Sequence, residues 1–226
     1  MHNPEKYLKS GKDERDLKLL VGLSWFFGFG SMMEFIACVI AIAVAYQAMK
    51  AYKLSKEKTL LYLNLSFVLI GAGLLVDALS SLIVLLAGLH RGFFYLFGVG
   101  YTINFLAQLF AYGLLVYAYV HQTRNLTAAT EALAAVPIVF FERNAVTELI
   151  LIFLLVYIAI QTSINYSINK NTNSMLVFGA FASLSIAHVF FLLYTVKPLF
   201  YPFAHIAQLF GFLLLLAMLL RVNHPS

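Results

Sequence analysis

Residues 60–88 read LLYLNLSFVLIGAGLLVDALSSLIVLLAG, a run of 29 residues in which Asp77 is the only charge. Folded as an α-helix with a rise of ~1.5 Å per residue, this run would be about 43 Å long. The hydrocarbon core of a bilayer is about 30 Å thick, and a helix needs about 20 apolar residues to cross it. The run therefore predicts a transmembrane helix.

Five further runs of the same character flank this one, at residues 31–50, 94–120, 147–165, 174–194 and 199–220. The whole chain is 62% hydrophobic and only 11% charged, whereas soluble domains carry about 25% charged residues. This composition excludes a soluble globular domain, a disordered chain and a disulfide-stapled secreted module. We expect an all-α, polytopic helical membrane protein with six core transmembrane helices.

The segments outside these runs are short or polar. Residues 1–18 form a polar tail of mixed charge, and residues 222–226 a short C-terminal tail. Residues 19–30 are apolar but would reach only about 18 Å as a helix, so they are interfacial, or a short seventh span. Gly28, Gly30 and Ser31 predict a break before the next run. The central connection, 121–146, contains a second short apolar stretch at 133–141.

Basic residues do not settle the orientation of six spans, because eight lie on one side and seven on the other. A seventh span at 19–30 would change the split to twelve against three and place the lysine-rich loop 50–58 in the cytoplasm. We expect a plasma membrane of prokaryotic type. The bilayer is the expected partner, and homo-oligomers or other membrane subunits stay open. Nothing indicates nucleic-acid binding, because membrane orientation accounts for the net charge of +5.

A weak internal repeat relates residues 31–120 to residues 147–221, which predicts a duplicated three-helix unit. The matching positions, in chain order, are Glu34-Phe35-Ile36 with Glu148-Leu149-Ile150, Phe67 with Phe178, Asp77 with His188, and Leu106-Ala107-Gln108-Leu109-Phe110 with Ile206-Ala207-Gln208-Leu209-Phe210. Three spans per copy would turn the second copy upside down if no other segment crosses between them. Inverted repeats of this kind are common in transporters.

Two histidines fall inside the last two runs at matching depth. His188 lies nine residues before Lys197, and His205 lies eight residues after it. Gln208 is three residues beyond His205 and therefore on the same helical face. A buried ionisable residue in a membrane costs about 2.5–3.5 kcal/mol on insertion scales, so we expect this pair to have polar partners.

A second matched pair lies in the first half of the chain. Asp77 lies fourteen residues before Arg91, and Asn104 lies thirteen residues after it. Gln108 is four residues beyond Asn104 on the same face. Together with the histidine pair, these residues predict a polar seam inside the bundle.

Four interpretations of the seam stay open. Its side chains hold the helices together by hydrogen bonds, or they line a permeation or proton path. A b-type haem between His188 and His205 is the third, although two residues joined by one turn would lie too close to bracket an iron. A histidine metal site that includes Asp77 is the fourth. We expect no cofactor.

Two carboxylates, Glu34 and Glu148, begin corresponding runs. Each would be favoured by the helix dipole in a first turn, or would bind cations at the mouths of the spans. Most tyrosines lie near run ends, which is typical of an aromatic belt at the membrane interface; Trp25 fits the same account.

The sequence contains no catalytic motif of a soluble enzyme, which favours a protein without enzymatic activity. Acid–base chemistry by Asp77 and His188 inside the membrane stays open. The leading hypothesis is a transport or channel-type protein that moves a small solute or ion along the seam between two three-helix repeats. One alternative is a non-catalytic scaffold or sensor subunit of a larger complex. The other is a haem-bearing electron-transfer subunit that uses His188 and His205.

Overall fold

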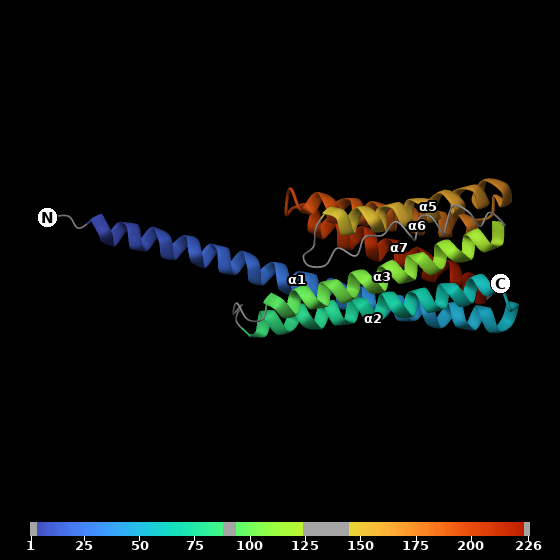
Figure 1. The fold of residues 1–226 in the computed structure, drawn as a ribbon, viewed down its shortest axis with the longest axis horizontal. Helices are drawn as coiled ribbons and strands as arrows, with labels where there is room; N and C mark the ends of the chain where they lie inside the picture. Colours follow the sequence, from blue (N-terminus) through green and yellow to red (C-terminus); the bar gives the residue numbers. More distant parts are fainter. Residues whose placement is uncertain (1–3, 88–93, 124–144, 224–226) are drawn as a thin grey trace.

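The computed structural model describes residues 4–87, 94–123 and 145–223. Six α-helices make up this part of the chain, and each contains a stretch long and apolar enough to cross a membrane, which confirms the predicted class and number of spans (Figure 1). Their bounds are α1 (Pro4–Ser55), α2 (Lys58–Leu86), α3 (Phe94–Thr123), α5 (Ala145–Asn169), α6 (Thr172–Tyr194) and α7 (Phe200–Asn223).

The helices form a bundle with polar groups inside and apolar side chains outside. Phe35, Phe153 and Phe210 are more than half exposed on its surface, whereas Asp77 and His188 are buried. A soluble protein shows the opposite distribution, because water solvates its polar groups. The bundle therefore fits lipid on its outer surface, and the protein is an integral, multi-pass membrane protein.

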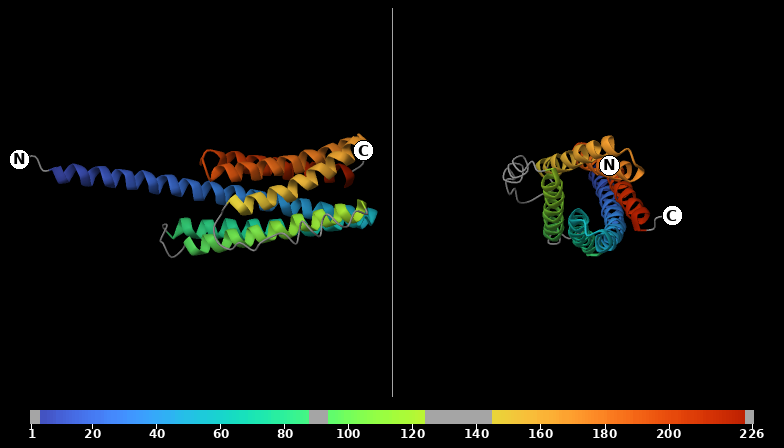
Figure 2. Two further views of the ribbon diagram at one scale, coloured as in Figure 1. Left: turned by 45° about the horizontal axis from the view of Figure 1, so that its top comes forward. Right: turned by 90° about the vertical axis from the view of Figure 1, so that its right-hand side faces the viewer.

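The helices pack as two three-helix groups that close into a ring. Each helix contacts the next within α1–α2–α3 and within α5–α6–α7, while α1 contacts α7 and α3 contacts α5. Figure 2 shows this arrangement along the bundle. The ring leaves a central region that all six helices can line.

Two tight turns at the same end of the bundle join α1 to α2 and α5 to α6. In each, a lysine adopts the left-handed conformation, Lys56 at φ 60° and Lys170 at φ 49°. The Lys56 amide donates to the Tyr52 carbonyl, as is usual at helix C-termini. Asn171 then begins α6 by accepting a 2.7 Å hydrogen bond from the Ser174 amide, which satisfies one free donor of the new helix.

The two groups run in the same direction through the bundle. The Tyr101 hydroxyl, near the start of α3, hydrogen-bonds to Thr147, near the start of α5, over 2.7 Å. Asn223 at the end of α7 donates to the Gln47 carbonyl in the second half of α1. Thus α3 lies parallel to α5 and α1 parallel to α7. The expected inversion of the second group is wrong, while the duplication itself stays a prediction.

The predicted break at Gly28–Ser31 is also wrong, because α1 continues without interruption from Pro4 to Ser55. Residues 19–30 are part of this helix and, with no turn between them and residue 31, form no separate seventh span. Glycine at position 30 allows α1 to pack closely against α7, because a Cβ there would clash with the Tyr201 hydroxyl. The apolar stretch 133–141 lies outside the described residues.

Candidate functional site

A polar cavity of about 20 Å³ lies inside the ring, and all six helices line it. That volume holds about one water molecule. It brings together seven of the eight residues that the sequence analysis selected: Glu34, Asn104, Gln108, Glu148, His188, His205 and Gln208. The eighth, Asp77, lies behind Asn104.

Hydrogen bonds join three of the predicted residues into a chain on α2 and α3. Asn104 Nδ2 donates to Asp77 Oδ2 over 2.9 Å, and Gln108 Nε2 donates to Asn104 Oδ1 over 3.0 Å. These two hydrogen bonds set the orientation of both amide groups, because each amide nitrogen donates to the next residue toward Asp77. Gln108 Oε1 is buried and has no hydrogen-bond partner within the described part of the chain.

A hydrogen bond joins α5 to its neighbour α6 at the cavity wall. His188 Nδ1 lies 2.8 Å from Glu148 Oε2, and both side chains are 3% exposed. Beside an ionised Glu148, a neutral imidazole donates its Nδ1–H in this hydrogen bond, and its Nε2 is then an acceptor. That Nε2 atom is buried and finds no partner in the described residues. The edge of the Tyr112 ring packs against the imidazole, with centroids 6.1 Å apart.

Aromatic rings surround His205 on three sides. Its imidazole makes T-shaped contacts with Tyr201, Phe191 and Phe29, at centroid distances of 4.5, 5.1 and 6.1 Å. Phe191 also contacts His188, at 5.8 Å. The two histidines therefore line one cavity, with the Phe191 ring packed against both.

The carboxylates Glu34 and Glu148 are both buried, at 4% and 2% exposure. Glu148 does lie in the first turn of α5, where the helix dipole favours a negative charge. Glu34 does not, since α1 begins thirty residues earlier. Both side chains line the central cavity rather than separate openings.

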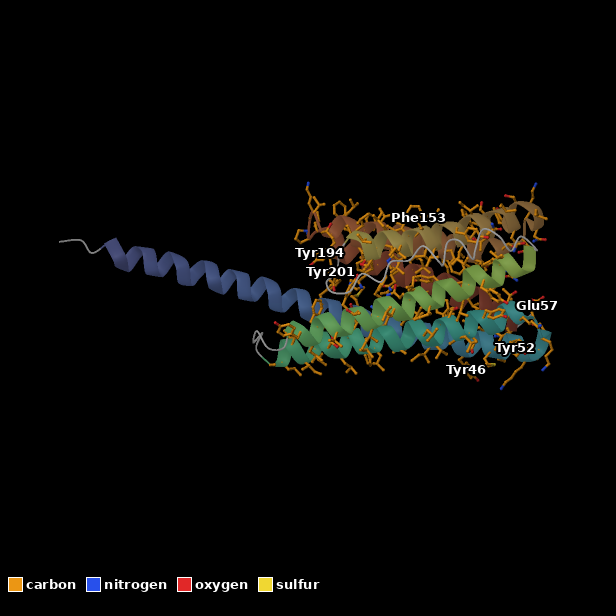
Figure 3. The ribbon with its side chains drawn as sticks, in the orientation of Figure 1. Tyr46, Tyr52, Glu57, Phe153, Tyr194 and Tyr201 are labelled. Carbon is orange, nitrogen blue, oxygen red and sulfur yellow. The ribbon has the colours of Figure 1, made fainter. Side chains whose placement is uncertain are left out.

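The polar residues occupy only one half of the bundle. Figure 3 shows Tyr201 and Tyr194 at one end, here called the Tyr201 end, and Glu57 at the opposite end, the Glu57 end. Glu148 lies three residues from the Tyr201 end of α5, and His188 six residues from that end of α6. The residues are thus a compact site and do not extend as a seam through the whole bundle.

Sequence reasoning missed two tyrosines by assigning them to the interfacial belt. Tyr101 lines the cavity and is 7% exposed, and Tyr112 is fully buried beside His188. Their spacing with Asn104 and Gln108 is a helical repeat of three and four residues, so all four share one face of α3. This spacing in the sequence could have identified both tyrosines as neighbours of Asn104 and Gln108.

The predicted haem and metal sites have little geometric support. A porphyrin far exceeds 20 Å³, so binding one between His188 and His205 would require the helices to separate. In the part of the chain that the structure describes, no group of three or more histidine, cysteine or acidic residues is arranged to hold a metal ion. The expectation that the protein carries no cofactor stays a prediction.

No family model, no curated protein and no solved structure matches this chain.

Proposed function

We propose that the protein moves protons or small monovalent cations across the membrane, with the central cavity as the binding site. The observation that carries this proposal is the composition of the cavity wall. Glu34 and Glu148 contribute carboxylates, whereas no lysine or arginine is found among the described residues that line it. A carboxylate inside a membrane is costly, and such residues commonly mark ion or proton paths.

The hydrogen-bond directions also favour a cation or a proton donor. The Asn104 amide donates to Asp77, and the Gln108 amide donates to Asn104. Gln108 Oε1 and, beside an ionised Glu148, His188 Nε2 are left as acceptors at the cavity. Two acceptors suit a species that donates hydrogen bonds or carries positive charge, such as a hydronium ion or a small metal cation.

The size of the cavity sets the scale of the transported species. About 20 Å³ accommodates a single water molecule or an ion of similar radius. Sugars, amino acids and larger organic cations would need a much wider conformation. We therefore favour a proton or an alkali cation over the broader class of small solutes.

Corresponding positions of the two three-helix groups contribute to the same site, which supports a duplicated unit as part of this proposal. Glu34 and Glu148 both line the cavity, as do Gln108 and Gln208. The left-handed lysines follow the same pattern, since Lys56 lies 22 residues after Glu34 and Lys170 lies 22 residues after Glu148. Because the groups are parallel, they would be related by an axis along the membrane normal.

The test is ion flux through the purified protein in liposomes. An internal pH-sensitive dye would report proton movement after a pH step, with K⁺ or Na⁺ gradients applied in separate runs. We expect flux above that of empty liposomes for protons or for one of the cations. Flux equal to that of empty liposomes in every condition would contradict transport and favour the non-catalytic subunit, for which a co-purifying partner would then be sought.

A further inference from the structure

A cleft with a polar rim opens at the Glu57 end of the bundle. It has a volume of about 230 Å³, more than ten times that of the central cavity. Its rim is polar and comes from α5, α6 and the residues around the start of α2: Glu57, Thr59, Asn165, Asn171, Asn173 and Ser174. Its inner wall is apolar and includes Leu115, Phe181 and Leu215. The lining of the cleft therefore changes from a polar rim to an apolar floor.

The floor of this cleft lies close to the central cavity along two helices. On α7, Gln208 lines the cavity and Leu215 lines the cleft, seven residues later. On α3, Gln108 lines the cavity and Leu115 the cleft, again seven residues later. Seven residues of helix span about 10 Å, so only about two turns separate the two spaces.

A layer of aromatic side chains lies in those two turns. The rings of Phe67 and Phe212 meet edge to face at a centroid distance of 5.4 Å, and both side chains are 0% exposed. Phe212 lies between Gln208 and Leu215 on α7, just as Tyr112 lies between Gln108 and Leu115 on α3. A dry constriction of this kind stops ions, because an ion would have to shed its hydration shell to enter it.

We propose that the cleft is the water-filled vestibule of the cation path on the Glu57 side, and that the Phe67–Phe212 contact is the gate between the vestibule and the central cavity. The vestibule receives the hydrated proton or alkali cation, with the Glu57 carboxylate and the asparagine amide oxygens as its polar lining. This inference rests on the proposed function. It adds the side of access, the gate, and the reason why the polar site occupies only half of the bundle.

In this proposal, the gate opens by movement of one three-helix group against the other. Phe67 belongs to α2 in the first group, and Phe212 belongs to α7 in the second group. Their contact lies across the boundary between the groups, so a small displacement of one group against the other separates the rings. Helices that carry the gate therefore need not unfold or bend.

Thiol accessibility tests the vestibule and the gate without any need for transport. Cys38 is the only cysteine, so a Cys38→Ala protein provides a background without thiols. Ser174→Cys places a thiol in the cleft, and Gln108→Cys places one in the cavity. A small methanethiosulfonate with an ammonium group is added on the Glu57 side of proteoliposomes, and unreacted thiols are then counted after denaturation.

We expect Ser174→Cys to react at least tenfold faster than Gln108→Cys. Adding Phe67→Ala and Phe212→Ala should speed the reaction of Gln108→Cys at least tenfold. The control Phe153→Ala, at a residue 73% exposed on the outer surface of the bundle, should leave that rate unchanged. An unreactive Ser174→Cys would overturn the vestibule. An unchanged rate for Gln108→Cys in the double alanine protein would overturn the gate.

A second variant covers the case in which the double alanine protein does not fold. Phe67→Cys with Phe212→Cys, cross-linked by a short bifunctional thiol reagent that a reductant cleaves, should hold the gate closed. Flux should then fall at least tenfold and return after cleavage, while wild-type flux is unaffected by either reagent. Undiminished flux through the cross-linked protein would overturn the gate. Absence of flux in the wild type would instead contradict the proposed function and leave accessibility to decide the gate.

Discussion

His188 Nδ1 lies 2.8 Å from Glu148 Oε2, and this contact ties α5 to α6 inside a part of the protein that water hardly reaches. A carboxylate at this depth has to compensate for the loss of its hydration. It does so here through a short, charge-assisted hydrogen bond. The pair also sets the hydrogen-bonding direction of the imidazole that faces the cavity.

Breaking this pair from either side should have unequal effects on stability. His188→Leu removes the imidazole hydrogen bond to a buried carboxylate and should cost about 3 kcal/mol, whereas Glu148→Gln keeps a hydrogen-bonding side chain beside a neutral imidazole and should cost about 1 kcal/mol. The double variant should show a coupling free energy of about 1–2 kcal/mol. Unfolding of the solubilised protein by a denaturing detergent measures all three values.

The control for this cycle is Asn64→Leu, which removes a buried amide that donates to the Ala45 carbonyl outside the cavity. A single interhelical hydrogen bond in a membrane contributes about 0.6 kcal/mol on average. A coupling energy between residues 148 and 188 no larger than that value would mean that the pair is only one more interhelical contact.

Two neighbouring glycines in α1 should respond in opposite ways to alanine. A Cβ on Gly28 would meet only Leu85 Cδ2, at 3.6 Å, whereas a Cβ on Gly30 would clash with the Tyr201 hydroxyl. Gly28→Ala should therefore stabilise the protein by about 0.5 kcal/mol through its helix propensity. Gly30→Ala should destabilise it by about 1–3 kcal/mol through overpacking.

Tyr201→Phe in the Gly30→Ala background should recover part of that loss, because it removes the clashing hydroxyl. Thermal unfolding of the four proteins provides the comparison. Equal effects of the two alanine substitutions would show that α1 and α7 do not approach at Gly30.

The parallel course of the two groups predicts which turns share a side of the membrane. Lys56 and Lys170 lie in turns at the Glu57 end, whereas Lys197 lies in the turn between α6 and α7 at the Tyr201 end. Single cysteines at these exposed positions, in the Cys38→Ala background, should react with an impermeant maleimide from one side at 56 and 170 and from the other at 197. Shared labelling of 56 and 197 would indicate the inverted arrangement instead.

The size of the cavity predicts that the purified protein carries no b-type haem. Its visible spectrum, oxidised and after dithionite reduction, should lack a Soret band and sharp α and β bands. A Soret band that disappears in His188→Ala or His205→Ala would contradict this account and make the protein a cytochrome.

The depth of residues on neighbouring helices was predictable from the sequence. When a short turn joins two helices, residues at equal distances from that turn along the chain lie at similar depth. Counting from the turn near residue 91 paired Asp77 with Asn104, and the structure places a 2.9 Å hydrogen bond between them. Spacing along α3 placed Asn104 and Gln108 on one face, and they too are hydrogen-bonded. These contacts need only the helix repeat.

The Glu148–His188 pair was not predictable in this way. Glu148 lies 21 residues before the end of α5, whereas His188 lies 16 residues after the start of α6. Counting residues from the turn between the two helices would therefore not pair Glu148 with His188. However, α5 is inclined to α6 (Figure 2), and residues at different distances from the turn can then lie at the same depth. Inclination depends on packing across the whole bundle, which a single sequence does not encode locally.

The direction of the second group also lay beyond the sequence. Counting spans predicts that the second group is inverted whenever three helices precede a connection that does not cross the membrane. The parallel arrangement is shown only by contacts between helices distant in sequence, such as Tyr101 with Thr147. The predicted break at Gly30 was wrong for a similar reason. Glycine in a helix favours either a break or a close approach, and the choice here depends on Tyr201, which lies 171 residues further along the chain.

The most direct test of the central claim is the flux of protons or alkali cations through liposomes that contain equal amounts of folded wild type, Glu148→Gln, His188→Ala, Asp77→Asn or Asn64→Leu. We predict that the Glu148 and His188 variants lose at least nine-tenths of the wild-type flux. Asp77→Asn should lose only part of the flux, because Asp77 reaches the cavity through Asn104, and Asn64→Leu should retain the flux. Full flux in the Asp77, Glu148 and His188 variants would contradict the account and leave the cavity a purely structural polar contact between helices.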